Sequence, residues 1–88
     1  MLVLTGKQGL TASWQKPFTP NIKCKKCGAN ARIVFTAFEG RETRDFICNI
    51  HKNTGNGKTG KYWPHDAIAV AVYLCEKCFE ANAEINQA

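Results

Sequence analysis

Two Cys-x-x-Cys pairs and several segments rich in β-forming residues predict a small, mainly β domain stabilised by a metal ion. The pairs are Cys24/Cys27 and Cys75/Cys78, which together supply a complete four-cysteine set for one tetrahedral ion. The chain has 88 residues and is 44% hydrophobic, enough for one modest core that gains from a structural metal. We therefore expect a single compact domain with a three-stranded antiparallel sheet and a short C-terminal helix.

Residues 1–21 are expected to form an extended N-terminal arm or edge strand. A short apolar run at residues 2–4 predicts a brief strand, and two prolines further on oppose a helix around Trp14 and Phe18. These two aromatic side chains are candidates to stack on nucleic-acid bases, but we expect them to cover the core instead. The remaining residues, 22–88, make up the four-cysteine domain.

The first cysteine pair is expected to form a tight metal-binding turn, or knuckle. Gly28 directly follows this pair, at a position where a knuckle commonly needs the positive φ that glycine adopts easily. The second pair is followed by Phe79 and has no such glycine. The two halves of the site are therefore predicted to differ in structure.

Three segments are predicted to be strands. Residues 31–38 are rich in β-branched and aromatic side chains, and a turn at 40–43 predicts a hairpin with a second strand at 44–50. Residues 67–74 alternate between aliphatic side chains and a small face that allows close approach by another segment. This third strand delivers Cys75 to the metal.

The stretch after the second pair, residues 79–85, lacks glycine and proline, and it lacks β-branching until its end. Its composition favours a helix, which completes the predicted fold with a short C-terminal element.

With its first knuckle, three strand-like segments and second cysteine pair, the stretch of about residues 22–80 resembles the zinc-ribbon group. The resemblance implies a fold and a bound zinc ion rather than an activity, because many unrelated functions share this spacing. A helix starting at the second pair would instead resemble a treble-clef finger, in which the last two ligands lie on the first turn of a helix. An iron site of rubredoxin type would use the same four sulfurs, so iron is the alternative to zinc.

Other uses of the cysteines fit the sequence less well. The N-terminal residues do not have the pattern of a secretory signal, so structural disulfides are not favoured and a cytoplasmic location is expected. A thioredoxin-like dithiol needs a single Cys-x-x-Cys within a βαβ pattern, which is not evident here.

A second metal site is a further hypothesis, with Cys48, His51 and His65 as ligands and Asp66 as a fourth. If residues 44–50 form a regular strand that continues to His51, the first two side chains point to opposite faces and do not chelate together. We therefore expect Cys48 to be a buried structural cysteine, and no catalytic residue is predicted.

The sequence also contains the tripeptide Gly57-Lys58-Thr59, which ends phosphate-binding loops. The pattern requires a glycine five positions earlier, where this chain has Lys52. We therefore reject nucleotide hydrolysis, and no other small-molecule substrate is indicated.

The formal net charge of +5 fits either an anionic partner or the ordinary charged surface of a small protein. Four thiolates and one zinc ion would lower this charge to about +3. Four lysines near the first knuckle are candidate contacts to nucleic acid: Lys16, Lys23, Lys25 and Lys26. Tyr62 and Trp63 are further candidate contacts. We expect a monomeric, non-enzymatic module that binds nucleic acid, or alternatively a protein, and that does not bind a membrane. The other alternative is a metal-dependent enzyme that uses a second site at Cys48, His51 and His65.

Overall fold

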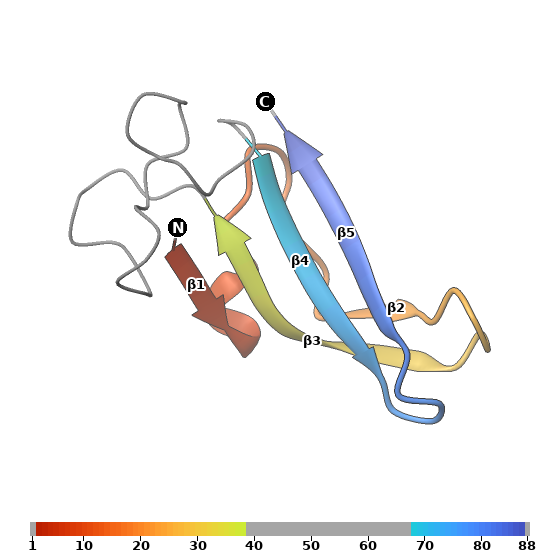
Figure 1. Ribbon diagram of the computed structural model, residues 1–88. Helices are drawn as coiled ribbons and strands as arrows, with labels where there is room; N and C mark the ends of the chain where they lie inside the picture. Colours follow the sequence, from red (N-terminus) through yellow and green to blue (C-terminus); the bar gives the residue numbers. More distant parts are fainter. Residues whose placement is uncertain (1, 39–67, 88) are drawn as a thin grey trace, which may run out of the picture.

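The computed structural model describes residues 2–38 and 68–87, which form a five-stranded antiparallel sheet (Figure 1). The elements are β1 (Leu2–Thr5), the 3-10 turn η1 (Gly6–Gly9), β2 (Asn21–Lys23), β3 (Asn30–Phe38), β4 (Ile68–Cys75) and β5 (Ala81–Gln87). The strand order is β1-β3-β4-β5, and β2 pairs with β3 beyond the end of β1. The mainly β, antiparallel fold predicted from the sequence is therefore confirmed, but the predicted number of three strands is wrong, because the sheet has five.

β3 and β4 are the central pair of the sheet, and both were expected from their β-forming residues. Their register runs from Ala31 opposite Cys75 to Phe38 opposite Ala69. Because the strands are antiparallel, the start of β3 lies beside the end of β4. This pairing brings the two cysteine pairs, which are far apart in sequence, to the same end of the sheet.

The first strand of the predicted hairpin is present as β3. One edge of β3 is paired with β1 and β2, and the other edge is paired with β4. Residues 40–43 and 44–50 themselves lie outside the described residues.

The predicted C-terminal helix is also wrong, because this part of the chain forms β5. β5 pairs with β4 from Ala81 opposite Leu74 to Gln87 opposite Ile68. β4 offers its second edge directly after a tight turn, and this pairing overrides the weak helix propensity of the segment. A strand, not a helix, follows the last two cysteines, so the treble-clef alternative is wrong as well.

The hydrophobic core lies on one face of the sheet. Its buried residues are Cys24, Ala31, Ile33, Ala71, Tyr73 and Cys75. The segment between η1 and β2 covers this face, since Phe18 packs on the core and the Trp14 ring stacks on the Phe38 ring. The centroids of these two rings lie 5.3 Å apart. The Tyr73 hydroxyl donates a hydrogen bond to the Thr19 carbonyl oxygen at 2.7 Å. Trp14 and Phe18 therefore cover the core, as expected.

The opposite face of the sheet is aliphatic and partly exposed. On it, the side chains of β4 at Ile68, Val70 and Val72 are half-buried. Leu74 and Ile85 are 42% and 64% exposed. The small face of β4 thus packs inward and its larger aliphatic side chains face outward. Within residues 2–38 and 68–87, no helix is long and apolar enough to cross a membrane.

The 3-10 turn η1 packs closely against β3 at Gly9. A Cβ atom at this position would lie 2.5 Å from Thr36 Oγ1 and 2.9 Å from the Leu4 carbonyl oxygen. We expect Gly9→Ala to lower the free energy of unfolding by about 1–3 kcal/mol, which urea denaturation measures. Thr36→Ala in the same chain should recover part of this loss, and strict additivity of the two changes would contradict the proposed clash.

Candidate metal centre

The four predicted cysteine ligands lie together, with all four sulfur atoms within 4.8 Å of one another. Cys24 Sγ lies 3.7 Å from Cys78 Sγ, and Cys27 Sγ lies 3.5 Å from Cys75 Sγ. Tetrahedral ligation with metal–sulfur bonds of about 2.3 Å places the sulfurs about 3.8 Å apart. The donor set and its spacing therefore fit one metal ion.

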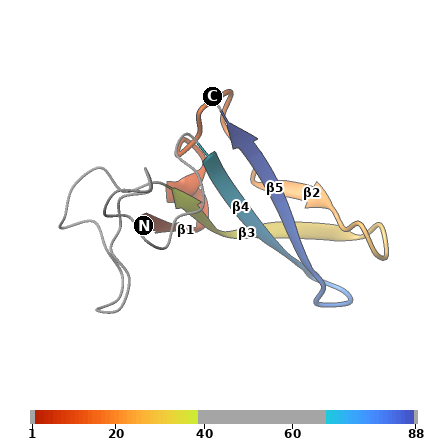
Figure 2. The same ribbon diagram turned by 45° about the horizontal axis from the view of Figure 1, so that its top comes forward.

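Two turns at the same end of the sheet supply the ligands. The first knuckle, residues 24–28, connects β2 to β3, and the second, residues 75–79, connects β4 to β5. Figures 1 and 2 show both turns side by side at the end of the sheet away from β1. The antiparallel pairing of β3 with β4 thus brings the two knuckles to the same end of the sheet.

The two knuckles have the same backbone geometry. Gly28 has φ 78° and its N–H donates to the Cys24 carbonyl oxygen at 2.9 Å. Phe79 has φ 62° and its N–H donates to the Cys75 carbonyl oxygen at 3.2 Å. The predicted structural difference between the two halves is wrong, because Phe79 adopts the left-handed conformation that is easy only for glycine.

Backbone N–H groups of the knuckles point at the sulfur atoms. Lys26 N lies 3.4 Å from Cys24 Sγ, and the N atoms of Lys77 and Cys78 each lie 3.4 Å from Cys75 Sγ. These hydrogen bonds stabilise negative charge on the sulfurs, which offsets part of the free energy needed to gather four thiolates.

Asn82 on β5 is a buried residue of the site that was not predicted from the sequence. The residue is 4% exposed, and its Oδ1 accepts a hydrogen bond from Lys25 N at 2.8 Å. Its Nδ2 lies 3.6 Å from Cys24 Sγ and 3.2 Å from the Glu80 carbonyl oxygen. One amide side chain thus ties the first knuckle to β5 and contacts a ligand sulfur.

The metal-free thiols have different proton affinities. Backbone N–H groups lower the pKa of Cys24 to about 6 despite its burial, and the N–H of Cys27 has the largest effect. The Cys78 N–H likewise lowers the pKa of Cys75. The Glu80 N–H lowers the pKa of Cys78, but burial and the other three cysteines outweigh this effect and raise the pKa to about 12. Near neutral pH, Cys24 is therefore a thiolate and Cys78 carries its proton.

Zinc affinity is expected to rise about tenfold or more per pH unit between about pH 6.5 and 8.5. Binding must displace at least the Cys78 proton, whose pKa of about 12 lies above this range. Cys24, with a pKa of about 6, is already deprotonated there and protonates only in more acidic solution, where the dependence steepens. Competition titrations against a chelator of known pH dependence measure this slope, and a pH-independent affinity would contradict it.

The four sulfurs fill all four positions of a tetrahedral site. Catalytic zinc sites usually keep one position for water or substrate, whereas structural sites are closed. Cys24 and Cys75 are buried, Cys78 is half-buried and Cys27 is exposed. This arrangement is typical of a structural metal site.

Some of the other predicted site residues lie outside the described part of the chain, and the rest lie on the surface. The proposed second-site ligands Cys48, His51 and His65 lie outside the described residues, as do Asp66, Tyr62 and Trp63. All four predicted lysine contacts, Lys16, Lys23, Lys25 and Lys26, are exposed. Lys25 and Lys26 also form ion pairs with Glu84 and Glu80 of the neighbouring strand region, at 3.9 and 3.8 Å.

The antiparallel sheet and the four-cysteine cluster fit a zinc-ribbon-like fold with a possible metal site. Comparisons with protein-family models, with curated proteins and with solved structures found no match for this chain. The functional interpretation therefore depends on the residues of this chain.

Proposed function

We propose that this protein is a non-enzymatic zinc-binding module that engages nucleic acid. The observation that carries the zinc assignment is the closed set of four sulfur ligands at tetrahedral spacing. The metal then has a structural role, and the exposed surface around it supplies the binding function. Iron would use the same ligands, and its visible absorption distinguishes it from colourless zinc.

The positive charge of the described surface supports an anionic partner. Lys7, Lys16, Lys23 and Lys77 are exposed, and among the described residues none of them forms an ion pair. The ion pairs of Lys25 and Lys26 are solvent-exposed, and such pairs contribute only about 0–1 kcal/mol. Phosphate groups can therefore replace the glutamates as partners of Lys25 and Lys26 with little loss of protein stability.

The test is a salt series with fluorescent single- and double-stranded oligonucleotides. If three or four lysines contact phosphates, the logarithm of affinity should fall with the logarithm of salt with a slope of about −2 to −4. Lys25→Glu and Lys26→Glu should weaken binding at low salt and make the slope shallower. The absence of binding to either kind of oligonucleotide at low salt would contradict nucleic acid as the partner and favour a protein.

A further inference from the structure

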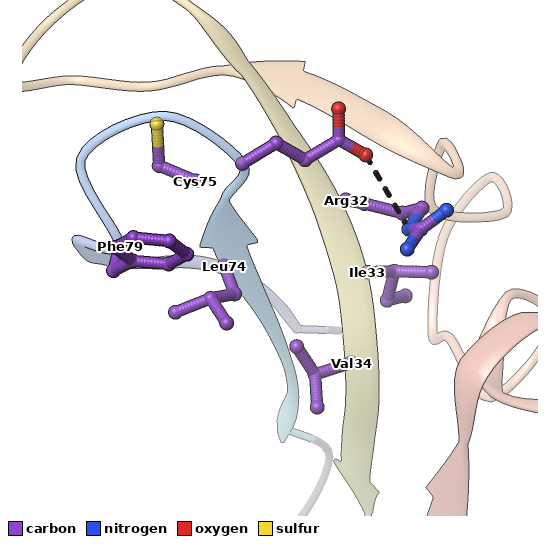
Figure 3. Close-up of a pocket in the computed structure, with 7 residues that line it drawn as sticks. Arg32, Ile33, Val34, Leu74, Cys75 and Phe79 are labelled. Atoms are coloured by element: carbon purple, nitrogen blue, oxygen red, sulfur yellow. Dashed lines mark ion pairs between the residues drawn. The ribbon is translucent and has the colours of Figure 1, made fainter.

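The described surface has a partly apolar hollow beside the second knuckle, with a volume of about 520 Å³. We call it the Phe79 hollow. Its lining includes three exposed apolar side chains: Phe79 is 72% exposed, Val34 is 43% exposed and Leu74 is 42% exposed. Figure 3 shows the Phe79 ring beside Leu74, with Val34 further along the floor. Large side chains of this kind gathered around a concave surface indicate a binding site.

A β-bulge shapes the floor of the Phe79 hollow. Ile33 is opposite Tyr73 and Phe35 is opposite Val72, so Val34 is the extra residue between two regular pairs. Bulges re-aim side chains and are over-represented next to functional sites. Here the bulge leaves Val34 exposed at the lining of the hollow.

Phe79 itself is held in an unfavourable backbone conformation. Its φ of 62° is in the left-handed region, where Gly28 occupies the equivalent position of the first knuckle. A glycine would complete the second knuckle without this strain, and the exposed Phe79 ring contributes little to the core. Strained residues of this kind cluster at ligand-binding sites, so the Phe79 ring is a candidate for ligand contact.

Positive charge lies at the rim of the Phe79 hollow. Arg32 pairs through Nε with Glu76 Oε1 at 3.5 Å, as the dashed line in Figure 3 marks, and its side chain is 73% exposed. A second hollow of about 450 Å³ shares Arg32, Ile33 and Glu76 with the first and adds Lys7. The two adjoining hollows therefore combine an aromatic surface with two cations and one carboxylate.

We propose that the Phe79 hollow binds an unpaired base of a single-stranded nucleic acid, with the base stacked on Phe79 and flanking phosphates at Arg32 and Lys7. This inference rests on the proposed function and adds the element that contacts a base. A single strand is required because its bases are free to stack on a protein ring. Positive charge next to an exposed aromatic ring complements a nucleotide, which carries both a flat base and an anionic phosphate.

A peptide strand fits this surface less well. Peptides that extend a sheet need a free strand edge for main-chain hydrogen bonds. Here the hollow is lined by β3 and β4, whose facing edges are paired with each other. The hollow therefore offers a ring, an apolar floor and charged side chains rather than an open edge.

The experiment measures binding of the zinc-loaded protein to fluorescent single-stranded oligo(dA) and to a duplex of the same length, by anisotropy at low salt. Phe79→Ala should weaken single-strand binding about 5- to 150-fold, the range expected for the loss of one base–aromatic stack. Phe79→Tyr, which keeps the ring, should bind like the unchanged protein. Phe79→Leu, which keeps only apolar character, should lose binding like Phe79→Ala.

Ile85→Ala is the matched control. Ile85 is another exposed aliphatic residue, 64% exposed on β5, and it lines neither hollow. Its truncation should leave affinity unchanged. Zinc content and amide NMR dispersion of each variant show whether the fold is retained. If Phe79→Ala does not fold, amide shifts of the unchanged protein during titration with oligo(dA) show whether the strand binds at the Phe79 hollow.

Titration shifts centred on Phe79, Leu74 and Arg32 would support the Phe79 hollow. If the unchanged protein binds oligo(dA) but Phe79→Ala or Phe79→Leu binds equally well, the inference is overturned while the proposed function stands. Amide shifts confined to Lys25 and Lys26 during the titration would likewise overturn the inference and leave the proposed function standing. If the unchanged protein binds neither single strands nor duplex, the proposed function fails and the inference fails with it.

Discussion

Cys24→Ser and Cys75→Ser should each abolish stoichiometric zinc binding and unfold the domain. Structural zinc in small domains contributes on the order of 10 kcal/mol of apparent binding free energy, which is comparable to the whole stability of a typical domain at about 5–15 kcal/mol. Both sulfurs are buried, and each lies within 3.7 Å of a second ligand sulfur. Zinc analysis and the dispersion of amide NMR signals measure the two effects.

The matched control is Cys48→Ser, the same chemical change at the fifth cysteine. The four clustered sulfurs complete a tetrahedral set without Cys48, so zinc content should stay unchanged in this variant. If Cys48 is a buried structural residue, the new hydroxyl lowers the free energy of unfolding by about 1–3 kcal/mol. Loss of zinc from Cys48→Ser, or a folded, zinc-loaded Cys24→Ser protein, would contradict the assigned ligand set.

Asn82→Ala is expected to have the next largest effect. The change leaves Lys25 N without its side-chain acceptor and removes the amide contact to Cys24 Sγ. We expect the free energy of unfolding of the zinc-loaded protein to fall by about 2–4 kcal/mol. Zinc affinity should fall about 10- to 100-fold, the usual effect of removing a group that orients a metal ligand. Denaturation and chelator competition measure the two quantities separately.

Asn86→Ala provides a control on the same strand. The Asn86 side chain accepts a hydrogen bond from Trp14 N at 3.2 Å and donates one to Ser13 Oγ at 2.8 Å. These contacts hold the N-terminal segment and involve no cysteine, so Asn86→Ala should reduce stability without changing zinc affinity. Equal losses of zinc affinity in the two variants would show that Asn82 acts only through general stability.

The cluster of four cysteines was predictable from sequence, because cysteine pairs at this spacing are typical of metal ligands. The spacing within each pair is sufficient to predict a knuckle, and the alternation in residues 67–74 correctly predicted the strand that ends at Cys75. Asn82 carries no such signal, because a single asparagine is usually a surface residue. Its role depends on β5, which brings it next to the first knuckle.

The C-terminal strand could not be predicted for a related reason. In β5 the inward side chains include Asn82, which is buried, and the outward ones include Ile85, so the usual pattern of apolar residues inside is reversed. Local propensity then favoured a helix, and only the edge of β4 decides the outcome. The positive φ of Phe79 was missed similarly, because the knuckle geometry overrides the preference of the residue.

The most direct test of a structural zinc ion is elemental analysis of the purified protein combined with amide NMR spectra before and after removal of the metal by a chelator. We expect one zinc ion per chain and a collapse of signal dispersion when the ion is removed, because the small sheet depends on the metal to hold the four cysteines of the two knuckles together. A well-dispersed spectrum of the metal-free protein, or a chain that binds no zinc, would contradict this expectation.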